Sequence, residues 1–224
     1  MTKTAILVDG AFFLKRYPRV YKKTGPLDPE VVASDLFAMC KKHLDSRNEH
    51  VPHSELYRIF YYDCYPSQKK VHNPITGKAI DFSKSDVFQF RESFFDELSK
   101  KRKVALRLGR LADHSAGWRI RPEPTKGILK KTLKVDELTE TDVYYEITQK
   151  GVDMRLGLDI ASLAFKAQVD QIVLVAGDSD FVPAAKLARR EGIDVVLDPM
   201  WMSVSGDLNL HIDGLWSTSP NPHP

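Results

Sequence analysis

The segment that most constrains the fold is an apolar run that ends abruptly in carboxylates. Residues 172–176 read Ile-Val-Leu-Val-Ala, and Gly-Asp-Ser-Asp follows at 177–180. A short run rich in Val and Ile, followed by a helical pattern over 181–191, is typical of a strand buried on both faces of a parallel sheet. Ligands of open α/β sheets bind beyond the carboxyl ends of the strands. The segment therefore predicts an α/β fold with Asp178 and Asp180 at its functional edge.

The start of the chain repeats this pattern. Residues 5–8 read Ala-Ile-Leu-Val and predict a second buried strand, which Asp9 and Gly10 follow. A further carboxylate, Asp153, lies at the start of the helix that is expected over residues 152–167. Carboxylates gathered in one place raise one another's pKa values unless a cation neutralises them. Because Mg²⁺ and Mn²⁺ take oxygen ligands, Asp9, Asp153, Asp178 and Asp180 together predict a divalent metal site.

Each of these aspartates also has a structural interpretation. Asp180 can cap the helix that begins near Phe181. Asp153 can be a carboxylate in the first turn of its helix, where it interacts favourably with the helix dipole. Asp9 can belong to an ordinary turn. Asp178 is the hardest of the four to explain structurally.

Asp159 stands apart from this group. It follows Asp153 by six residues, roughly 240° around a helix, so the two side chains do not face one metal squarely. An ion pair between Arg155 and Asp159, four residues apart on one helix face, is sufficient to explain it.

Strands and helices alternate along the chain, which predicts one α/β domain over residues 1–216 with a mostly parallel central sheet flanked by helices. A basic, irregular insertion is expected at about 113–142, as a hairpin or flexible segment, and a disordered Pro-rich tail at 217–224. Residues 10–27 are expected to form a basic loop or a short helix with a loop. The predicted strands are 4–8, 56–62, 104–111, 143–147, 171–176 and 194–197, and the predicted helices are 28–44, 83–101, 152–167 and 181–191, with a short helix or strand near 208–215.

Charge is concentrated in one segment, although the net charge of the 224 residues is only +3. Residues 100–134 hold twelve Lys or Arg against Asp113 and Glu123, a concentration that suits a polyanion such as RNA. Trp118 lies between cations and can stack an unpaired base. Alternatively, the first lysines only end a helix and Trp118 packs in a hairpin. The predicted RNA contacts are Lys15, Arg16, Trp118, Arg119, Arg121, Lys130 and Lys131.

The remaining sequence features bear on location and assembly. Cys40 and Cys64 follow no metal-binding spacing, and a reducing cytoplasm is the simplest setting. No secretory segment and no run of about 20 apolar residues is found, so no membrane contact is expected. Trp201, Met202 and Trp216 fit either the edge of the core or the surface of a homodimer.

Three segments carry a family resemblance. They are residues 6–10 (Ile-Leu-Val-Asp-Gly), residues 150–153 (Lys-Gly-Val-Asp) with Asp159 after them, and residues 174–183. Together they resemble the signature segments of the NYN domain family, and more narrowly of its LabA-like branch. The resemblance runs from about residue 4 to 198. It implies a PIN-like three-layer sandwich and a Mg²⁺- or Mn²⁺-dependent ribonuclease acting on RNA. We expect this RNA to be single-stranded.

The resemblance also assigns roles to residues. It implies that Asp9, Asp153 and Asp178 are the catalytic, metal-binding carboxylates, with Asp180 contributing directly or through water. Many family members have an Asn shortly after the first Asp-Gly, where this chain has Phe12 and Phe13. This departure leaves open a catalytically weak or inactive RNA-binding or regulatory module of the same fold.

Other enzyme classes fit the sequence less well. A phosphatase of the haloacid dehalogenase type needs a second Asp two residues after the first, where this chain has Ala11. The chain has no phosphate-binding loop of the Gly-x-x-x-x-Gly-Lys type and no nucleophile elbow.

Overall fold

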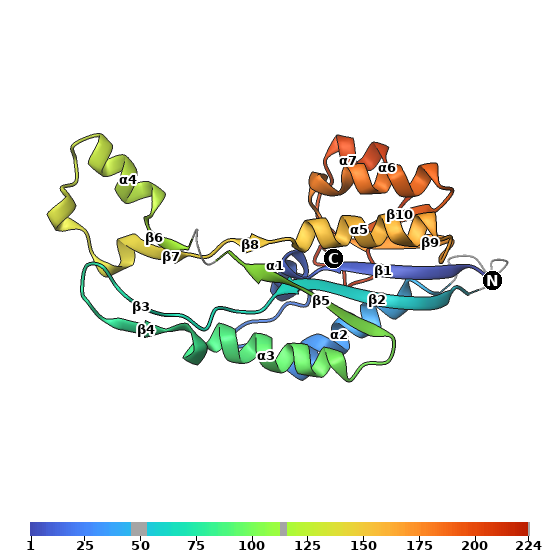
Figure 1. The fold of residues 1–224 in the computed structure, drawn as a ribbon, viewed down its shortest axis with the longest axis horizontal. Helices are drawn as coiled ribbons and strands as arrows, with labels where there is room; N and C mark the ends of the chain where they lie inside the picture. The colour runs from blue at the N-terminus through green and yellow to red at the C-terminus, as the bar shows by residue number, and fades with distance from the viewer. Residues whose placement is uncertain (46–52, 113–115, 224) are drawn as a thin grey trace.

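The computed structural model describes residues 1–45, 53–112 and 116–223. A central sheet carries helices on both faces (Figure 1), which confirms the predicted α/β sandwich with a mostly parallel sheet. Residues 10–20 form a helix, so of the two expectations for residues 10–27 the short helix followed by a loop is the one observed.

The central sheet has seven strands in the order β11-β10-β9-β1-β2-β5-β8. All neighbouring pairs are parallel except β5 and β8. The strands are β1 (Lys3–Asp9), β2 (Glu55–Cys64), β5 (Val104–Leu111), β8 (Gln149–Lys150), β9 (Gln171–Val175), β10 (Asp194–Asp198) and β11 (Gly214–Leu215).

The strand order reverses direction at β1. The chain first adds β2 and β5 on one side of β1, and later adds β9 and β10 on the other side. In open α/β sheets such a reversal leaves a crevice at the carboxyl ends of the two strands involved, here β1 and β9. The fold therefore places residues 9–10 and 176–180 at the position where such sheets bind ligands.

Two helical layers cover the sheet. The helices α1, α2 and α3 pack on one face, over a core that includes Ile6, Val8, Tyr61 and Phe94. The helices α5, α6 and α7 cover the other face, over Leu7, Leu174 and neighbouring apolar residues. The helices are α1 (Gly10–Val20), α2 (Pro29–Lys42), α3 (Asp86–Ser99), α5 (Val152–Phe165), α6 (Val182–Arg190) and α7 (Gly206–Leu210).

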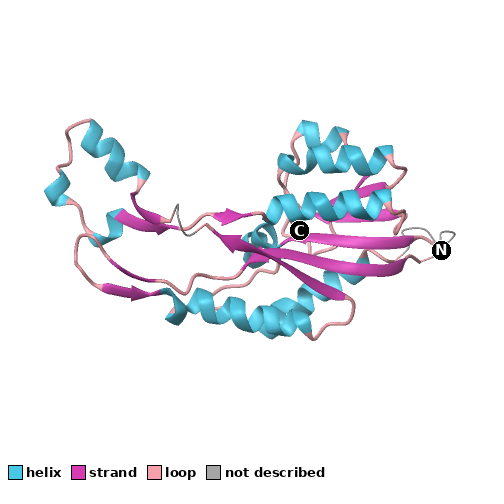
Figure 2. Cartoon of the chain, in the orientation of Figure 1, coloured by secondary structure: helices cyan, strands magenta, loops and turns pink. Residues whose placement is uncertain are grey.

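An arm extends beyond the sheet, at the left of Figures 1 and 2. It combines two antiparallel pairs and one helix, and the Phe82 and Tyr145 rings, 5.6 Å apart, join its two halves. The expected hairpin is present as a pair of strands, whereas the helix between them was not predicted; residues 113–115 lie outside the described residues. The arm elements are β3 (Lys70–His72), β4 (Ala79–Asp81), β6 (Gly117–Ile120), α4 (Pro122–Leu129) and β7 (Val143–Glu146).

The C-terminal segment is packed at its beginning. Thr218 and Ser219, which fall in the expected tail, are buried. The Thr218 hydroxyl donates to the Met39 carbonyl at 2.9 Å, and the Trp201 indole N–H donates to the Ser219 carbonyl at 3.0 Å. Residues 218 and 219 therefore cover the end of α2 and the loop after β10.

Among the described residues, no helix is long and apolar enough to cross a membrane. Cys40 and Cys64 are both buried and carry free thiols.

Candidate active site

Asp9 and Asp178 follow the two strands at which the sheet order reverses. Val8 pairs with Val175 in the parallel register of β1 and β9, so the chain leaves both strands at the same level. Asp9 ends β1 directly, and Asp178 comes three residues after the end of β9. The predicted convergence of the two strand ends is therefore present in the fold.

Asp9 is held by the start of α1. It is the N-cap residue, and its Oδ1 accepts the Phe12 backbone N–H at 3.1 Å. Gly10 lets this turn pass close to β2, since a Cβ there would lie 2.7 Å from the Tyr62 carbonyl oxygen. Burial raises the pKa of Asp9 to about 6, and the Phe12 N–H opposes this rise while Asp153 adds to it.

Asp178 occupies the corresponding position after β9. It caps a 3₁₀ turn over Ser179–Phe181, and its Oδ1 accepts the Asp180 backbone N–H at 3.1 Å. The structural interpretation of Asp180 as the cap of the next helix is not observed, because α6 has Phe181 as its N-cap and no side-chain cap bond. Asp178 and Asp180 are both exposed.

Asp153 joins this group electrostatically. It lies in the first turn of α5, after Gly151, whose φ of 78° starts the helix in the left-handed region. Burial raises the pKa of Asp153, and the charges of Asp178 and Asp180 raise it further. The same carboxylate raises the pKa of Asp9, so α5, β1 and the loop after β9 present mutually repelling charges to one region.

A cavity of about 630 Å³ opens beside these carboxylates. Asp9 and Asp178 line it together with three cations of α1, which are Lys15, Arg16 and Arg19. Asp153 and Asp180 are not among its described lining residues. The cavity therefore brings two carboxylates and three cations together in one space.

Arg16 is anchored at the wall of this cavity. Its Nη2 donates to the Met200 carbonyl at 2.7 Å, whereas its buried Nε has no partner among the described residues. Burial lowers the pKa of Arg16, and the charge of Arg19 lowers it further. An anion between these guanidinium groups would relieve both effects.

The two phenylalanines that depart from the family pattern have different surroundings. Phe13 is fully buried in the core against Tyr17, with 5.5 Å between ring centroids. Phe12 instead lines the cavity, beside Met202 and Gly177. A Cβ on Gly177 would lie 2.6 Å from Phe12 Cε2, so the ring packs directly against the loop that carries Asp178.

The carboxylates beside the cavity differ in how closely they approach one another. Among the described residues, no three or more His, Cys, Asp or Glu side chains converge closely enough to hold a metal ion. The donor chemistry nevertheless fits a hard cation, because the carboxylate of Asp153 raises the pKa of Asp9 and is itself repelled by the charges of Asp178 and Asp180.

Asp159 has a structural role, but with a different partner from the one predicted. Its carboxylate accepts the Arg107 Nε at 2.7 Å and the Tyr62 hydroxyl at 2.8 Å. The expected Arg155–Asp159 pair is thus replaced by a bond between α5 and β5, because β5 brings Arg107 under the helix.

Asp63 is a residue of this edge that the sequence analysis did not select. It lies near the end of β2, next to β1, is fully buried, and pairs with Arg91 of α3 at 2.6 Å. Its charge contributes to the raised pKa of Asp9. Its position directly after the predicted strand 56–62 is the sequence feature that could have identified it.

The other predicted RNA contacts lie on the arm. Arg119 Nε pairs with Glu146 at 3.1 Å, and Arg121 Nε donates to the Thr141 carbonyl at 2.8 Å. Trp118 packs edge-on against Tyr145, with 5.6 Å between centroids, as the hairpin interpretation expects. Lys130 and Lys131 are exposed just after α4. Figure 1 shows the arm well apart from the start of α1, so these residues and the cavity form two separate groups.

The three residues considered for a dimer surface make contacts within the chain. Met202 lines the cavity. The Trp201 indole N–H is hydrogen-bonded to the Ser219 carbonyl, and the Trp216 ring packs against the His43 ring with 5.1 Å between centroids. These contacts agree with the core-edge interpretation of the three residues.

The seven-stranded, mostly parallel sheet between two helical layers fits the PIN-like class of α/β proteins. The NYN domain family model matches residues 124–203, which confirms the predicted resemblance to that family over this part of the chain. The match contains Asp153, Asp178 and Asp180, while Asp9 lies outside it. The NYN family belongs to the PIN-like superfamily and is generally ribonuclease-like.

One similar solved structure is a protein of unknown function from Vibrio parahaemolyticus. It is 16% identical, with a TM-score of 0.45, and the alignment covers 96% of this chain and 91% of that one. No curated protein matches the chain.

Proposed function

We propose that the protein is a Mg²⁺- or Mn²⁺-dependent ribonuclease of the LabA-like branch of NYN domains. The observation that supports this proposal is the cavity that Asp9 and Asp178 share with Lys15, Arg16 and Arg19. Carboxylates beside cations suit a metal-assisted reaction of a phosphodiester. The buried free thiols of Cys40 and Cys64 are consistent with action in the reducing cytoplasm.

The carboxylates would hold the metal. In this proposal Asp9, Asp153 and Asp178 are its ligands, and Asp180 contributes directly or through water. When bound, such a metal polarises a phosphoryl oxygen and lowers the pKa of a water molecule.

The cations of α1 would hold the substrate. Lys15 and Arg19 are four residues apart, on one helix face, and Arg16 is fixed by its bond to Met200. These side chains would orient the phosphodiester backbone against Asp9 and Asp178, and Phe12 would exclude water from one wall of the cavity. The hydrolysis of an RNA phosphodiester is the reaction that this arrangement supports best.

The arm would extend the contact with RNA. Lys130 and Lys131 are available for phosphates, Trp118 and Arg119 stand on β6, and Arg121 lies between β6 and α4. Unpaired bases can stack on exposed rings, so we propose single-stranded RNA as the substrate.

A second candidate function is supported by Phe12. Its apolar ring stands in the cavity where many family members have Asn, so a polar group that would orient water is absent from this position. The protein would then be an RNA-binding or regulatory module of the same fold.

Cleavage of labelled single-stranded RNA by the full chain, with Mn²⁺, Mg²⁺ or EDTA, separates the two candidates. The ribonuclease predicts cleavage with either metal and none with EDTA. Metal-dependent binding without cleavage would favour the regulatory module, and the absence of both would contradict the two proposals together.

A further inference from the structure

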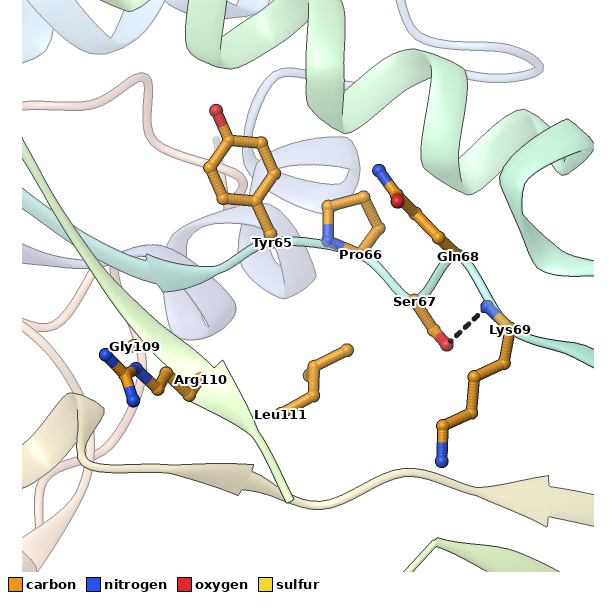
Figure 3. A pocket seen from close by; sticks show the side chains of 8 residues that line it. All are labelled: Tyr65, Pro66, Ser67, Gln68, Lys69, Gly109, Arg110 and Leu111. Atoms are coloured by element: carbon orange, nitrogen blue, oxygen red, sulfur yellow. Dashed lines mark hydrogen bonds between the residues drawn. The ribbon is translucent and has the colours of Figure 1, made fainter. Parts of the chain in front are cut away.

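A second cavity, of about 620 Å³, opens at the carboxyl ends of β2 and β5. Residues 65–69, which follow β2, form one wall, and residues 109–111 of β5 form the other (Figure 3). Gly109 keeps this second wall close to the domain, since a Cβ there would lie 2.9 Å from the Lys150 carbonyl oxygen. We call this space the β2–β5 groove.

The lining of the β2–β5 groove differs from that of the acidic cavity. Among its described lining residues there is no carboxylate, and the two charged ones are Lys69 and Arg110. In Figure 3 these cations stand toward opposite ends, with Pro66 and Leu111 between them. A cation, an apolar surface and a second cation match the order of phosphate, nucleoside and phosphate along a nucleic acid strand.

Tyr65 adds an aromatic surface at the rim of this groove, where its ring points away from Leu111 and Lys69 (Figure 3). Its side chain is 53% exposed, although its ring is held edge-on against Phe95 at 5.5 Å. A ring that is fixed on one side and open on the other can stack an unpaired base at low entropic cost.

The groove lies on the same edge of the sheet as the acidic cavity. Asp9 pairs in register with Tyr62 of β2, and Cys64, two residues further on, pairs with Gly109 of β5. Since neighbouring strands are about 4.8 Å apart, the groove begins roughly 10 Å across the sheet from Asp9. A strand of a few nucleotides spans this distance.

We propose that the β2–β5 groove is a binding site for a nucleotide of single-stranded RNA, on the same strand whose phosphodiester lies beside Asp9 and Asp178. Arg110 and Lys69 hold the flanking phosphates, and Tyr65 stacks the base. This site extends the proposed function, on which it rests, and it makes the enzyme favour RNA long enough to reach both places.

The test compares a fluorescein-labelled uridine dinucleotide with labelled poly-uridine of about 12 nucleotides, because the dinucleotide has one phosphodiester and cannot occupy both sites. Affinity is measured by anisotropy with Mg²⁺ for the full chain carrying Asp178→Asn, alone and with Arg110→Glu, Tyr65→Ala or Tyr65→Phe. Lys166→Glu is the matched control, since Lys166 is an exposed cation at the far end of α5. Circular dichroism confirms that each variant is folded.

We expect Arg110→Glu and Tyr65→Ala to weaken binding of the longer RNA about tenfold and to leave the shorter one unchanged. Tyr65→Phe and Lys166→Glu should bind both like the parent protein. If all variants bind the longer RNA equally while the wild-type chain binds and cleaves RNA, this site is overturned and the proposed function stays intact. A wild-type chain that neither binds nor cleaves RNA would overturn both.

Discussion

The ring of Phe12 packs against Gly177, so that the first turn of α1 and the loop carrying Asp178 are in contact. A Cβ on Gly177 would lie 2.6 Å from Phe12 Cε2 and 2.3 Å from Met202 Cε. Both distances are shorter than side-chain contacts allow. The absence of a side chain at Gly177 therefore fixes how closely the two acidic strand ends approach.

Gly177→Ala is expected to displace Phe12 or the loop, with a loss of stability of about 1–3 kcal/mol and reduced RNA cleavage. The control is Gly157→Ala in α5, where an added Cβ meets no atom within 4 Å and should stabilise the helix by about 0.5–1 kcal/mol. Urea unfolding measures both changes. A Gly177→Ala variant as stable as the wild type would show that the contact is not tight.

The pKa of Asp9 predicts a pH-dependent stability of the metal-free protein. Because the folded pKa, about 6, is above the ordinary value of 3.8, ionisation penalises the folded state. The penalty is absent below pH 4, grows between about pH 4 and 6, and stays constant above. Asp9→Asn retains the cap and should therefore stabilise the protein at pH 8, by at most about 3 kcal/mol, with little change at pH 4. Thermal unfolding in EDTA at both pH values measures the difference, and an equal effect at both would contradict burial of the charge.

Metal should reverse the order of stability of the wild type and Asp9→Asn if the carboxylates are its ligands. A ligand that binds the folded state alone at 100 times its Kd stabilises it by about 2.7 kcal/mol. Mn²⁺ is thus expected to raise the Tm of the wild type, and EDTA to restore it, while Asp9→Asn and Asp153→Asn respond less. Asp136→Asn, an exposed position on the arm, is the control. An equal response of all four proteins would place the metal elsewhere.

The buried pair of His43 and Asp198 should set stability rather than chemistry. His43 Nε2 lies 2.8 Å from Asp198 Oδ2, both side chains are fully buried, and the other carboxylate oxygen accepts the Met200 N–H at 2.8 Å. His43→Ala leaves a buried carboxylate without this partner and is expected to cost about 3–5 kcal/mol, whereas His72→Ala, on an exposed strand of the arm, should cost little. Urea unfolding measures both. Equal stability of the two variants would show that the pair contributes nothing.

The central part of the fold could be predicted from the sequence because its signals are local. Residues 5–8 and 172–176 are short apolar runs that each end in Asp, and parallel strands bring such ends to one edge. The structure places Asp9 and Asp178 there, on either side of the reversal of strand order. Lys15 and Arg16, predicted as RNA contacts, line the same cavity.

The rest depends on packing between distant segments. Asp63 and Arg91 meet because α3 crosses the end of β2, and Asp159 meets Arg107 because α5 lies over β5. The basic segment of 100–134 also extends partly along the arm, where acidic residues such as Glu146 neutralise it. Spacing along one helix or one run of charge contains no information about such partners.

The most direct test of the central claim is the rate of single-stranded RNA cleavage with Mn²⁺ by the wild type, Asp178→Asn and Asp136→Asn. If Asp178 is a metal-binding catalytic carboxylate, Asp178→Asn should lose about 100-fold or more of the rate while its fold and RNA affinity are retained, and Asp136→Asn should cleave like the wild type. Cleavage by Asp178→Asn at the wild-type rate would contradict the assignment.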